Sequence, residues 1–309
     1  MKPSISALLK QHAFIVFVAL AVLISWFPWY TTGTGFLVLG PSIAGVIIIA
    51  ITSGKEGLRD LGQRALRWRV GFLWWAVALF FTGLIVLLAI VINAALGGGL
   101  PSFAFFRQEW HLIPVYFLIT MIGGPLGEEF GWRGFALPNL QRKWGPMVAS
   151  IVIGIVWALW HLPLFFQPET LHAQIGLQLL PVYVVGEIVL AIIITWVYNK
   201  TRGSLLVGGI ILHNADNFWA STLLINETMT TAFQGGAQSQ LDMQLYIVST
   251  VVGVLAALIL AIATRRQLGL SDDRYRECLE APCRANRLPK VDSAFRAPLV
   301  DAVAHPLRC

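Results

Sequence analysis

The 309-residue sequence is too apolar and too poor in charge for an ordinary soluble domain. Hydrophobic residues make up 57% of it and charged residues only 12%, whereas soluble domains have roughly a quarter charged residues. The net charge is +6, but the basic residues lie in short loops between apolar runs, which favours membrane topology over nucleic-acid binding. The composition predicts an all-α, polytopic helical bundle in a lipid bilayer, with no nucleic-acid partner.

Eight apolar runs divide most of the chain, and each is near the roughly 20 residues that a membrane-spanning helix needs. They are residues 12–30, 33–53, 71–96, 111–127, 148–166, 179–198, 204–224 and 244–264. With both termini cytoplasmic, every Lys and Arg except Arg107 falls on the cytoplasmic side, as the positive-inside rule requires. Because one span more or fewer would invert every later loop, this distribution favours eight spans and cytoplasmic termini.

In chain order, the runs fall into four predicted segments. Residues 1–110 contain helices 1–3 and a basic loop at 54–70, which is typical either of an interfacial helix or of ordinary cytoplasmic loop charge. Residues 111–224 contain helices 4–7, and residues 225–266 an outside loop and helix 8. Residues 267–309 are polar and interrupted by prolines, which predicts a disordered cytoplasmic tail. The tail also holds Cys278, Cys283 and Cys309; the first two have CxxxxC spacing without a nearby histidine, a pattern that only weakly indicates a structural metal or a disulfide.

Paired carboxylates follow the fourth apolar run, in the sequence GGPLGEEFGWRG. Charged groups in hydrocarbon are costly unless they are paired or face a cavity, so these residues are candidates for function. The i, i+4 spacing of Glu129 and Arg133 predicts an ion pair. Glu128 then lies on another helix face, where it could act as a general base in a cavity, and Pro125 should kink the helix before it. An ordinary interfacial salt bridge is the alternative.

Two further pairs of polar or aromatic residues recur at helical spacing. In the fifth run, Trp157 and His161 lie four residues apart and project from the same side. In the seventh run, His213 and Asn217 repeat this spacing, with Asp216 on a neighbouring face. Each residue alone is also typical of a packed helix interior.

A carboxylate, two imidazoles and an amide from helices 4, 5 and 7 could activate water and stabilise an oxyanion at a carbonyl. Glu128, His161 and His213 could equally bind Zn²⁺ with an open position for water, and spacing does not separate the two. Because histidines near mid-membrane must meet Glu128, helix 4 should run deeper than its hydropathy suggests, with a wet cavity reaching inward. Glu187 is expected to line a cavity or pair helices.

Together these segments resemble the CAAX-protease and bacteriocin-processing (CPBP) family of intramembrane proteases, which includes the type II CAAX prenyl endopeptidases. The resemblance covers about residues 112–220. The family's EExxxR, FxxxH and HxxxN motifs correspond to Glu128-Glu129-Arg133, Trp157-His161 and His213-Asn217, and its RTGS loop resembles residues 201–204. Trp157 stands where the family usually has Phe, which puts the size of the substrate cleft in question.

The resemblance implies that Glu128 activates water with help from His161, that His213 and Asn217 stabilise the oxyanion, and that Glu129 and Arg133 have supporting roles. The predicted function is an intramembrane endopeptidase, zinc-assisted or not, that cleaves a membrane-bound protein or peptide near the cytoplasmic face. The expected location is the plasma membrane of a bacterium. The alternative is a non-catalytic membrane protein for partner binding or bacteriocin self-immunity, in which the polar cluster only fixes helix packing.

Overall fold

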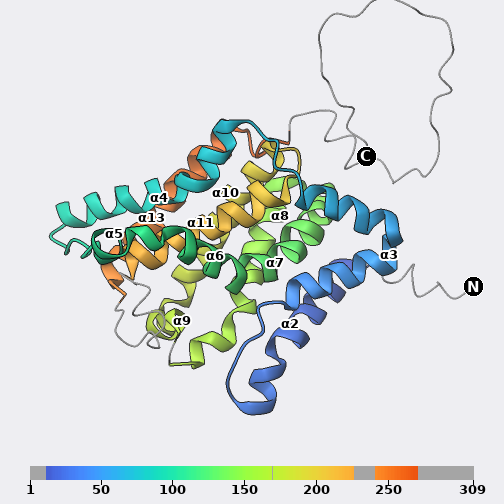
Figure 1. The fold of residues 1–309 in the computed structure, drawn as a ribbon, viewed down its shortest axis with the longest axis horizontal. Helices are drawn as coiled ribbons and strands as arrows, with labels where there is room; N and C mark the ends of the chain where they lie inside the picture. The colour runs from blue at the N-terminus through green and yellow to red at the C-terminus, as the bar shows by residue number, and fades with distance from the viewer. Residues whose placement is uncertain (1–11, 169, 226–240, 271–309) are drawn as a thin grey trace, which may run out of the picture.

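A computed structural model of the chain describes residues 12–168, 170–225 and 241–270 (Figure 1). Within these ranges every regular element is a helix and no strand occurs, which confirms the prediction of an all-α bundle. The cytoplasmic placement of the termini, most of the predicted tail and outside loop, and the three cysteines concern residues outside the described ranges.

Three long helices form the first third of the chain: α2 (Ala13–Thr32), α3 (Gly40–Ala65) and α4 (Phe72–Ala95). Helix α2 ends at Gly33, whose φ of 76° lies in the left-handed region that glycine adopts without steric cost. Helix α3 bends at Gly54, where φ is 60°, and then continues to Ala65. The basic loop predicted at 54–70 is therefore largely helical, and its place on the membrane surface stays a prediction.

The predicted fourth span, 111–127, is not one helix. The short α5 (Ala104–Gln108) and η1 (Trp110–Leu112) lead into α6 (Ile113–Gly123), and α7 (Pro125–Gly131) begins after a break. At the break, Gly124 has φ −145° and ψ −85°. The expected kink at the Gly-Gly-Pro sequence is thus a full break, because Pro125 suits the first turn of a new helix. The paired carboxylates belong to this new helix.

The described residues after α7 are helical with few interruptions. The elements are η2 (Trp132–Ala136), α8 (Leu137–Trp160), η3 (Leu162–Phe166), α9 (Leu171–Ile175), η4 (Leu177–Leu179), α10 (Leu180–Lys200), η5 (Leu206–Ile211), α11 (Leu212–Trp219), η6 (Ala220–Leu224) and α13 (Met243–Ala263). Helix α8 changes direction at Gly145, where φ is 75°. The segments η2, η5 and η6 are π-helical, a geometry found mostly as local bulges at functional sites.

Six stretches of the described residues are long and apolar enough to cross a membrane. They are Ala13–Thr32, Gly40–Ala65, Phe72–Ala95, Pro125–Phe166, Leu177–Lys200 and Met243–Ala263, with Trp110–Gly123 as a shorter apolar helix. The predicted seventh span is present as the consecutive helical turns η5, α11 and η6. The chain is a multi-pass membrane protein, and the count of eight spans stays a prediction.

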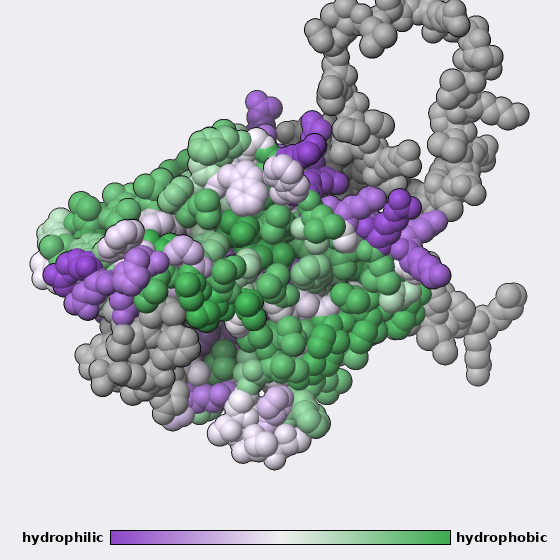
Figure 2. All heavy atoms as spheres, in the orientation of Figure 1, coloured by the Kyte–Doolittle hydropathy of each residue, from purple (hydrophilic) through white to green (hydrophobic). Residues whose placement is uncertain are grey.

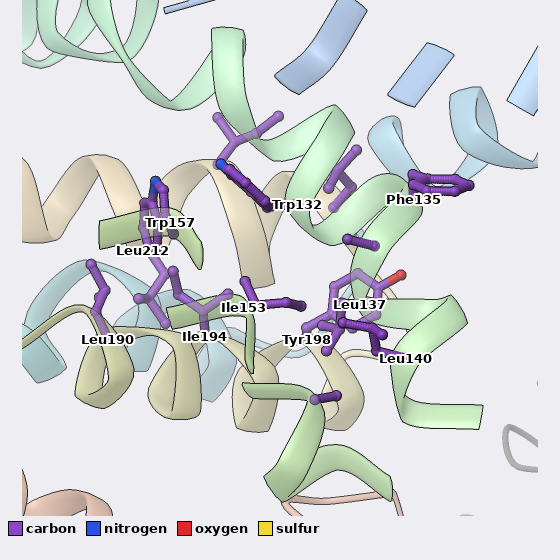
Figure 3. Packing of buried hydrophobic residues seen from close by; sticks show 14 of the residues in the cluster. Trp132, Phe135, Leu137, Leu140, Ile153, Trp157, Leu190, Ile194, Tyr198 and Leu212 are labelled. Carbon is purple, nitrogen blue, oxygen red and sulfur yellow. The ribbon is translucent and has the colours of Figure 1, made fainter. Parts of the chain in front are cut away.

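The bundle is packed around α8 and α10, whose buried side chains meet in one core cluster. Figure 3 shows Ile153 of α8 and Ile194 of α10 in this cluster, with Trp132 above them. Close backbone approach brings the helices together: a Cβ on Gly154 would lie 2.5 Å from the Cα of Ile188. Small residues at such contacts are typical of membrane bundles, where packing rather than water exclusion drives association.

The face of the molecule in Figure 2 has an apolar middle and polar ends. Figure 2 shows a broad hydrophobic surface, with hydrophilic side chains gathered beside the end of α3 and beside α5. Large apolar side chains such as Phe72, Val91 and Ile262 are mostly exposed, which suits contact with lipid tails. The outer surface therefore agrees with the bilayer setting predicted from composition.

Basic segments that are distant in sequence meet at the α3 end. A guanidinium nitrogen of Arg67 donates to the carbonyl oxygen of Arg202, and Ser204 Oγ donates to the carbonyl oxygen of Arg67 at 2.6 Å. Asn199 Nδ2 donates to the carbonyl oxygen of Leu268 at 3.1 Å. These contacts place three segments that the charge count assigned to the cytoplasm at one end of the bundle, which we call the basic end.

Candidate active site

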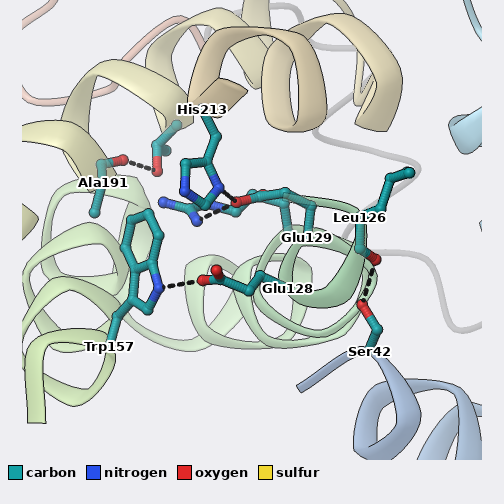
Figure 4. Close-up of polar contacts among 9 residues, drawn as sticks. Ser42, Leu126, Glu128, Glu129, Trp157, Ala191 and His213 are labelled. Carbon is teal, nitrogen blue, oxygen red and sulfur yellow. Dashed lines mark hydrogen bonds and ion pairs between the residues drawn. The ribbon is translucent and has the colours of Figure 1, made fainter. Parts of the chain in front are cut away.

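Two neighbouring glutamates leave α7 in different directions (Figure 4). Glu128 is 4% exposed and Glu129 is completely buried. Consecutive residues on a helix point about 100° apart, so one turn delivers each carboxylate to a different environment. Figure 4 shows Glu128 facing Trp157 and Glu129 facing His213.

Glu128 is held by the indole of Trp157. Trp157 Nε1 donates to Glu128 Oε2 at 2.6 Å, and the indole itself is 1% exposed. A hydrogen bond to a charged acceptor is shorter and stronger than a neutral one, so it fixes the carboxylate's orientation. One carboxylate oxygen is thereby engaged, and the side chain lines a cavity.

Glu129 joins an arginine and a histidine in one buried network. Its Oε1 accepts a hydrogen bond from Arg133 Nη1 at 2.7 Å and one from His213 Nδ1 at 2.8 Å. The guanidinium carbon of Arg133 lies 4.4 Å from the centre of the Trp157 ring. Arg133, which the charge count placed on the cytoplasmic side, lies in the π-helical turn η2 and is completely buried.

His213 is held on two sides. Its ring meets Trp157 edge to face, with centroids 4.9 Å apart and an interplanar angle of 85°. Because a carboxylate only accepts hydrogen bonds, the contact with Glu129 places a proton on His213 Nδ1 and leaves Nε2 for another partner.

His161 follows directly after α8 and is half-buried. Its Nδ1 lies 3.1 Å from the carbonyl oxygen of Trp157 and 3.0 Å from the hydroxyl oxygen of Tyr183. The same hydroxyl lies 3.1 Å from Nε2 of His172, on α9. Burial in the cavity wall lowers the pKa of His172 to about 4, so this imidazole is neutral at physiological pH.

A cavity of about 380 Å³ joins these side chains. Glu128, His161, His213 and Asn217, the four residues predicted to be catalytic, all line it. A Cβ on Gly124 would lie 3.5 Å from Asn217 Nδ2 and 3.6 Å from Glu128 Oε1, so the amide and the carboxylate face the same point beside the helix break. The structure brings the four together, and their chemical roles stay predictions.

Glu187 lines the cavity, as expected from the sequence, whereas Tyr183, Thr82 and His172 were not singled out from the sequence. Tyr183 and Glu187 on α10 are one helical turn apart and in hydrogen-bonding contact, and Asp216 on α11 and Thr82 on α4 also line the cavity. The i, i+4 spacing of Tyr183 and Glu187 could have predicted the contact between their side chains. For His172 no sequence signal existed, because α9 is a short helix in a connection.

The predicted zinc ligands do not form a ready site. Within residues 12–168, 170–225 and 241–270, no three His, Cys, Asp or Glu side chains lie close enough together to hold one metal ion. Glu128, His161 and His213 would have to move together to bind Zn²⁺ jointly. The present positions therefore do not fit that ligand set.

The fold and the cavity define a class: a multi-pass membrane protein with Glu, His and Asn side chains lining an internal cavity. The family model described as type II CAAX prenyl endopeptidase, Rce1-like, matches residues 109–219, a range that contains every site motif. CAAX prenyl protease 2 of Methanococcus maripaludis is 30% identical over 200 residues, which cover 61% of this chain and 71% of that protein. The chain belongs to the type II CAAX prenyl endopeptidase family and is a multi-pass membrane peptidase.

Proposed function

We propose that the cavity hydrolyses a peptide bond of a membrane-bound, CAAX-type protein substrate by direct attack of water. The observation that supports this most is the position of Glu128. Its carboxylate is buried, has one oxygen held by Trp157, and lines a cavity whose wall also contains His161, His213 and Asn217. A fixed carboxylate beside hydrogen-bond donors is the arrangement that water activation and oxyanion stabilisation require.

In the proposed reaction, Glu128 accepts a proton from water as the water oxygen bonds to the scissile carbonyl carbon. The carbonyl oxygen becomes an oxyanion, to which Asn217 Nδ2 and a doubly protonated His213 donate. The carbon–nitrogen bond then breaks, and the proton held by Glu128 passes to the leaving amine. His161 Nε2 assists this proton transfer. No acyl-enzyme forms, because no Ser or Cys accompanies a histidine at equivalent positions in these motifs.

Replacing the carboxylate of Glu128 with an amide tests the proposal. We expect Glu128→Gln to abolish cleavage of a prenylated CAAX-type peptide by the purified protein in lipid nanodiscs, because an amide cannot accept the proton. Cleavage is measured by mass spectrometry of the released C-terminal fragment. Glu56→Gln, at an exposed position of α3, makes the same chemical change away from the cavity and should retain full activity. Normal turnover by Glu128→Gln would remove the proposal.

The non-catalytic alternative makes the opposite prediction for the same variant. If the cluster only fixes helix packing, no cleaved product forms with the unaltered protein, and the cellular phenotype survives Glu128→Gln whenever the protein still accumulates. Bacteriocin self-immunity belongs to this alternative. Comparative membrane proteomics of cells with the unaltered protein and with Glu128→Gln would distinguish the two and identify a natural substrate.

Zinc assistance remains a separate proposal, with Glu128, His161 and His213 as its ligands. Because these side chains are not arranged around one point, the reaction above is derived from the protein's own groups. Metal analysis of the active protein, with chelation and zinc restoration as the functional test, decides between the two forms.

The proposal also includes the membrane face near which the substrate is cleaved. The sequence predicts cleavage near the cytoplasmic face and a location in the plasma membrane of a bacterium. Glu129 is close to the basic end, since Arg64 of α3 donates to the carbonyl oxygen of Gly134 at 3.0 Å. The cavity, however, is also lined by Phe36 and Leu164, which belong to connections at the other end. The chemistry proposed here does not depend on this choice.

A further inference from the structure

The hydroxyl of Tyr183 lies between two histidines from different parts of the chain. It is 3.0 Å from His161 Nδ1 and 3.1 Å from His172 Nε2. The side chain of Tyr183 is 8% exposed, and all three residues line the cavity. Neither Tyr183 nor His172 belongs to the motifs EExxxR, FxxxH and HxxxN.

The contacts of His161 determine the direction of these hydrogen bonds. The carbonyl oxygen of Trp157, 3.1 Å from His161 Nδ1, can only accept, so Nδ1 must carry the proton. The hydroxyl oxygen of Tyr183 then accepts a second branch of the same N–H. Its own proton is directed away from His161, toward His172 Nε2 or toward the carboxylate of Glu187. With either acceptor, His161 Nε2 keeps its lone pair.

Ring packing fixes the positions of His161 and His172 relative to each other. The imidazoles of His161 and His172 are stacked, with centroids 5.1 Å apart and an interplanar angle of 22°. Phe165 closes the other side of His172, edge to face at 5.4 Å. Helix α9, which carries His172, is anchored at its start by Thr170, whose Oγ1 donates to the carbonyl oxygen of Leu164 at 2.6 Å.

We propose that Tyr183 and His172 are positioning residues that hold the ring orientation of His161, whose tautomer is set by the carbonyl of Trp157, so that its Nε2 serves the reaction. The inference rests on the proposed function, in which His161 assists proton transfer. In histidine sites generally, the partner of one ring nitrogen decides which nitrogen is protonated. Here the carbonyl oxygen of Trp157 is that partner, while Tyr183, in contact with His172, shares the same N–H and holds the ring in place. Helix α9 joins the catalytic apparatus through this contact.

Removing the hydroxyl alone tests this role. We expect Tyr183→Phe to lower kcat by about ten- to a hundredfold, the range typical of removing a hydrogen-bond partner that orients a functional histidine. KM should not change, because the hydroxyl acts through His161 and not on substrate. Steady-state kinetics on the CAAX-type peptide measure both constants. Tyr198→Phe is the matched control: it removes a buried hydroxyl from the same helix, one whose partner is Arg64, and should leave kcat unchanged even if it lowers stability.

Variants of His172 separate positioning from simple packing. A glutamine can accept the tyrosine proton through its amide oxygen, so His172→Gln should retain more activity than His172→Ala. The double variant Tyr183→Phe/His172→Ala should be no slower than Tyr183→Phe, because residues acting as one unit are not additive. A folded Tyr183→Phe protein with unchanged kcat, a change in KM alone, or fully multiplicative effects in the double variant would overturn the inference.

The activity of Glu128→Gln distinguishes a failure of this inference from a failure of the proposed function. If Glu128→Gln is inactive and Tyr183→Phe is fully active, the hydrolytic function stands and the positioning role fails. If Glu128→Gln cleaves the peptide at the normal rate, Glu128 is not the base and the proposed mechanism itself fails. Melting curves in detergent establish that each variant is folded, and His172 lies in a connection outside the long apolar helices, where substitution disturbs the bundle least.

Discussion

Trp157 contacts three residues of the candidate site, although the motif spacing links it only to His161. Its Nε1 donates to Glu128, its ring face meets the guanidinium of Arg133, and its ring stands edge to face with His213. A Phe, the usual residue of the family at this position, offers the ring but no N–H. Trp157, which stands in place of the family's usual Phe, therefore gives Glu128, the proposed base, a hydrogen bond.

The indole N–H should contribute to rate. We expect Trp157→Phe to remain active with kcat lowered about ten- to a hundredfold, because a hydrogen bond to a charged group is worth about 1.5–3 kcal/mol and 1.4 kcal/mol corresponds to a factor of ten. Turnover of the CAAX-type peptide measures the effect. Trp132→Phe is the control, since Trp132 is completely buried and its Nε1 has no hydrogen-bond partner among the described residues. Equal kcat values for Trp157→Phe and the unaltered protein would contradict this role.

At the scale of single residues, spacing predicted what lies on one helix. The i, i+4 rule gave the ion pair of Glu129 and Arg133, found at 2.7 Å. It could not show that Glu129 also holds His213, 84 residues away, or that Tyr183 reaches His172. Contacts between helices depend on their rotation and crossing, which no local pattern specifies.

At the scale of elements, helix breaks at glycine position the site. Gly124 separates α6 from α7 and places Glu128 in the first turn of the new helix. Helix α7 also packs closely on α3: a Cβ on Gly131 would lie 2.2 Å from the carbonyl oxygen of Pro41. Hydropathy merged these pieces into one span because apolar content continues across the break, while backbone direction does not.

The close contact of α7 with α3 should tolerate no side chain. We expect Gly131→Ala to destabilise the protein by about 1–3 kcal/mol, the usual cost of overpacking, since the obstacle is backbone and cannot move aside. Gly62→Ala, on the polar part of α3 where a Cβ would meet nothing within 4 Å, should instead be neutral or stabilising by about 0.5–1 kcal/mol. Thermal unfolding in detergent compares the two, and equal melting temperatures would disprove the close packing.

At the scale of the whole molecule, the cavity and the basic end do not coincide. The basic end gathers Arg67, Arg202 and Leu268, whereas the cavity wall includes Phe36 and His172 from connections at the opposite end. The positive-inside rule predicts that the basic end is cytoplasmic. The cavity then extends toward the outer face, while the predicted site of cleavage is near the cytoplasm.

Labelling with an impermeant maleimide decides the orientation. In a chain whose three native cysteines are replaced, Thr34→Cys and Gln63→Cys place one exposed thiol at each end. If the charge count is correct, Thr34→Cys reacts in intact cells and Gln63→Cys only after permeabilisation. The reverse pattern would overturn the predicted topology and turn the cavity toward the cytoplasm.

The sequence by itself determined the membrane class, the all-α fold, the family and the four residues of the candidate site, because these follow from composition, hydropathy and short motifs. Only the tertiary structure decided which groups orient them: Trp157 on Glu128, Glu129 on His213, and Tyr183 with His172 on His161. The physical reason is that apolar periodicity fixes which residues are helical and buried. The breaks at Gly124 and Gly145, and the close glycine contacts, fix how the helices meet.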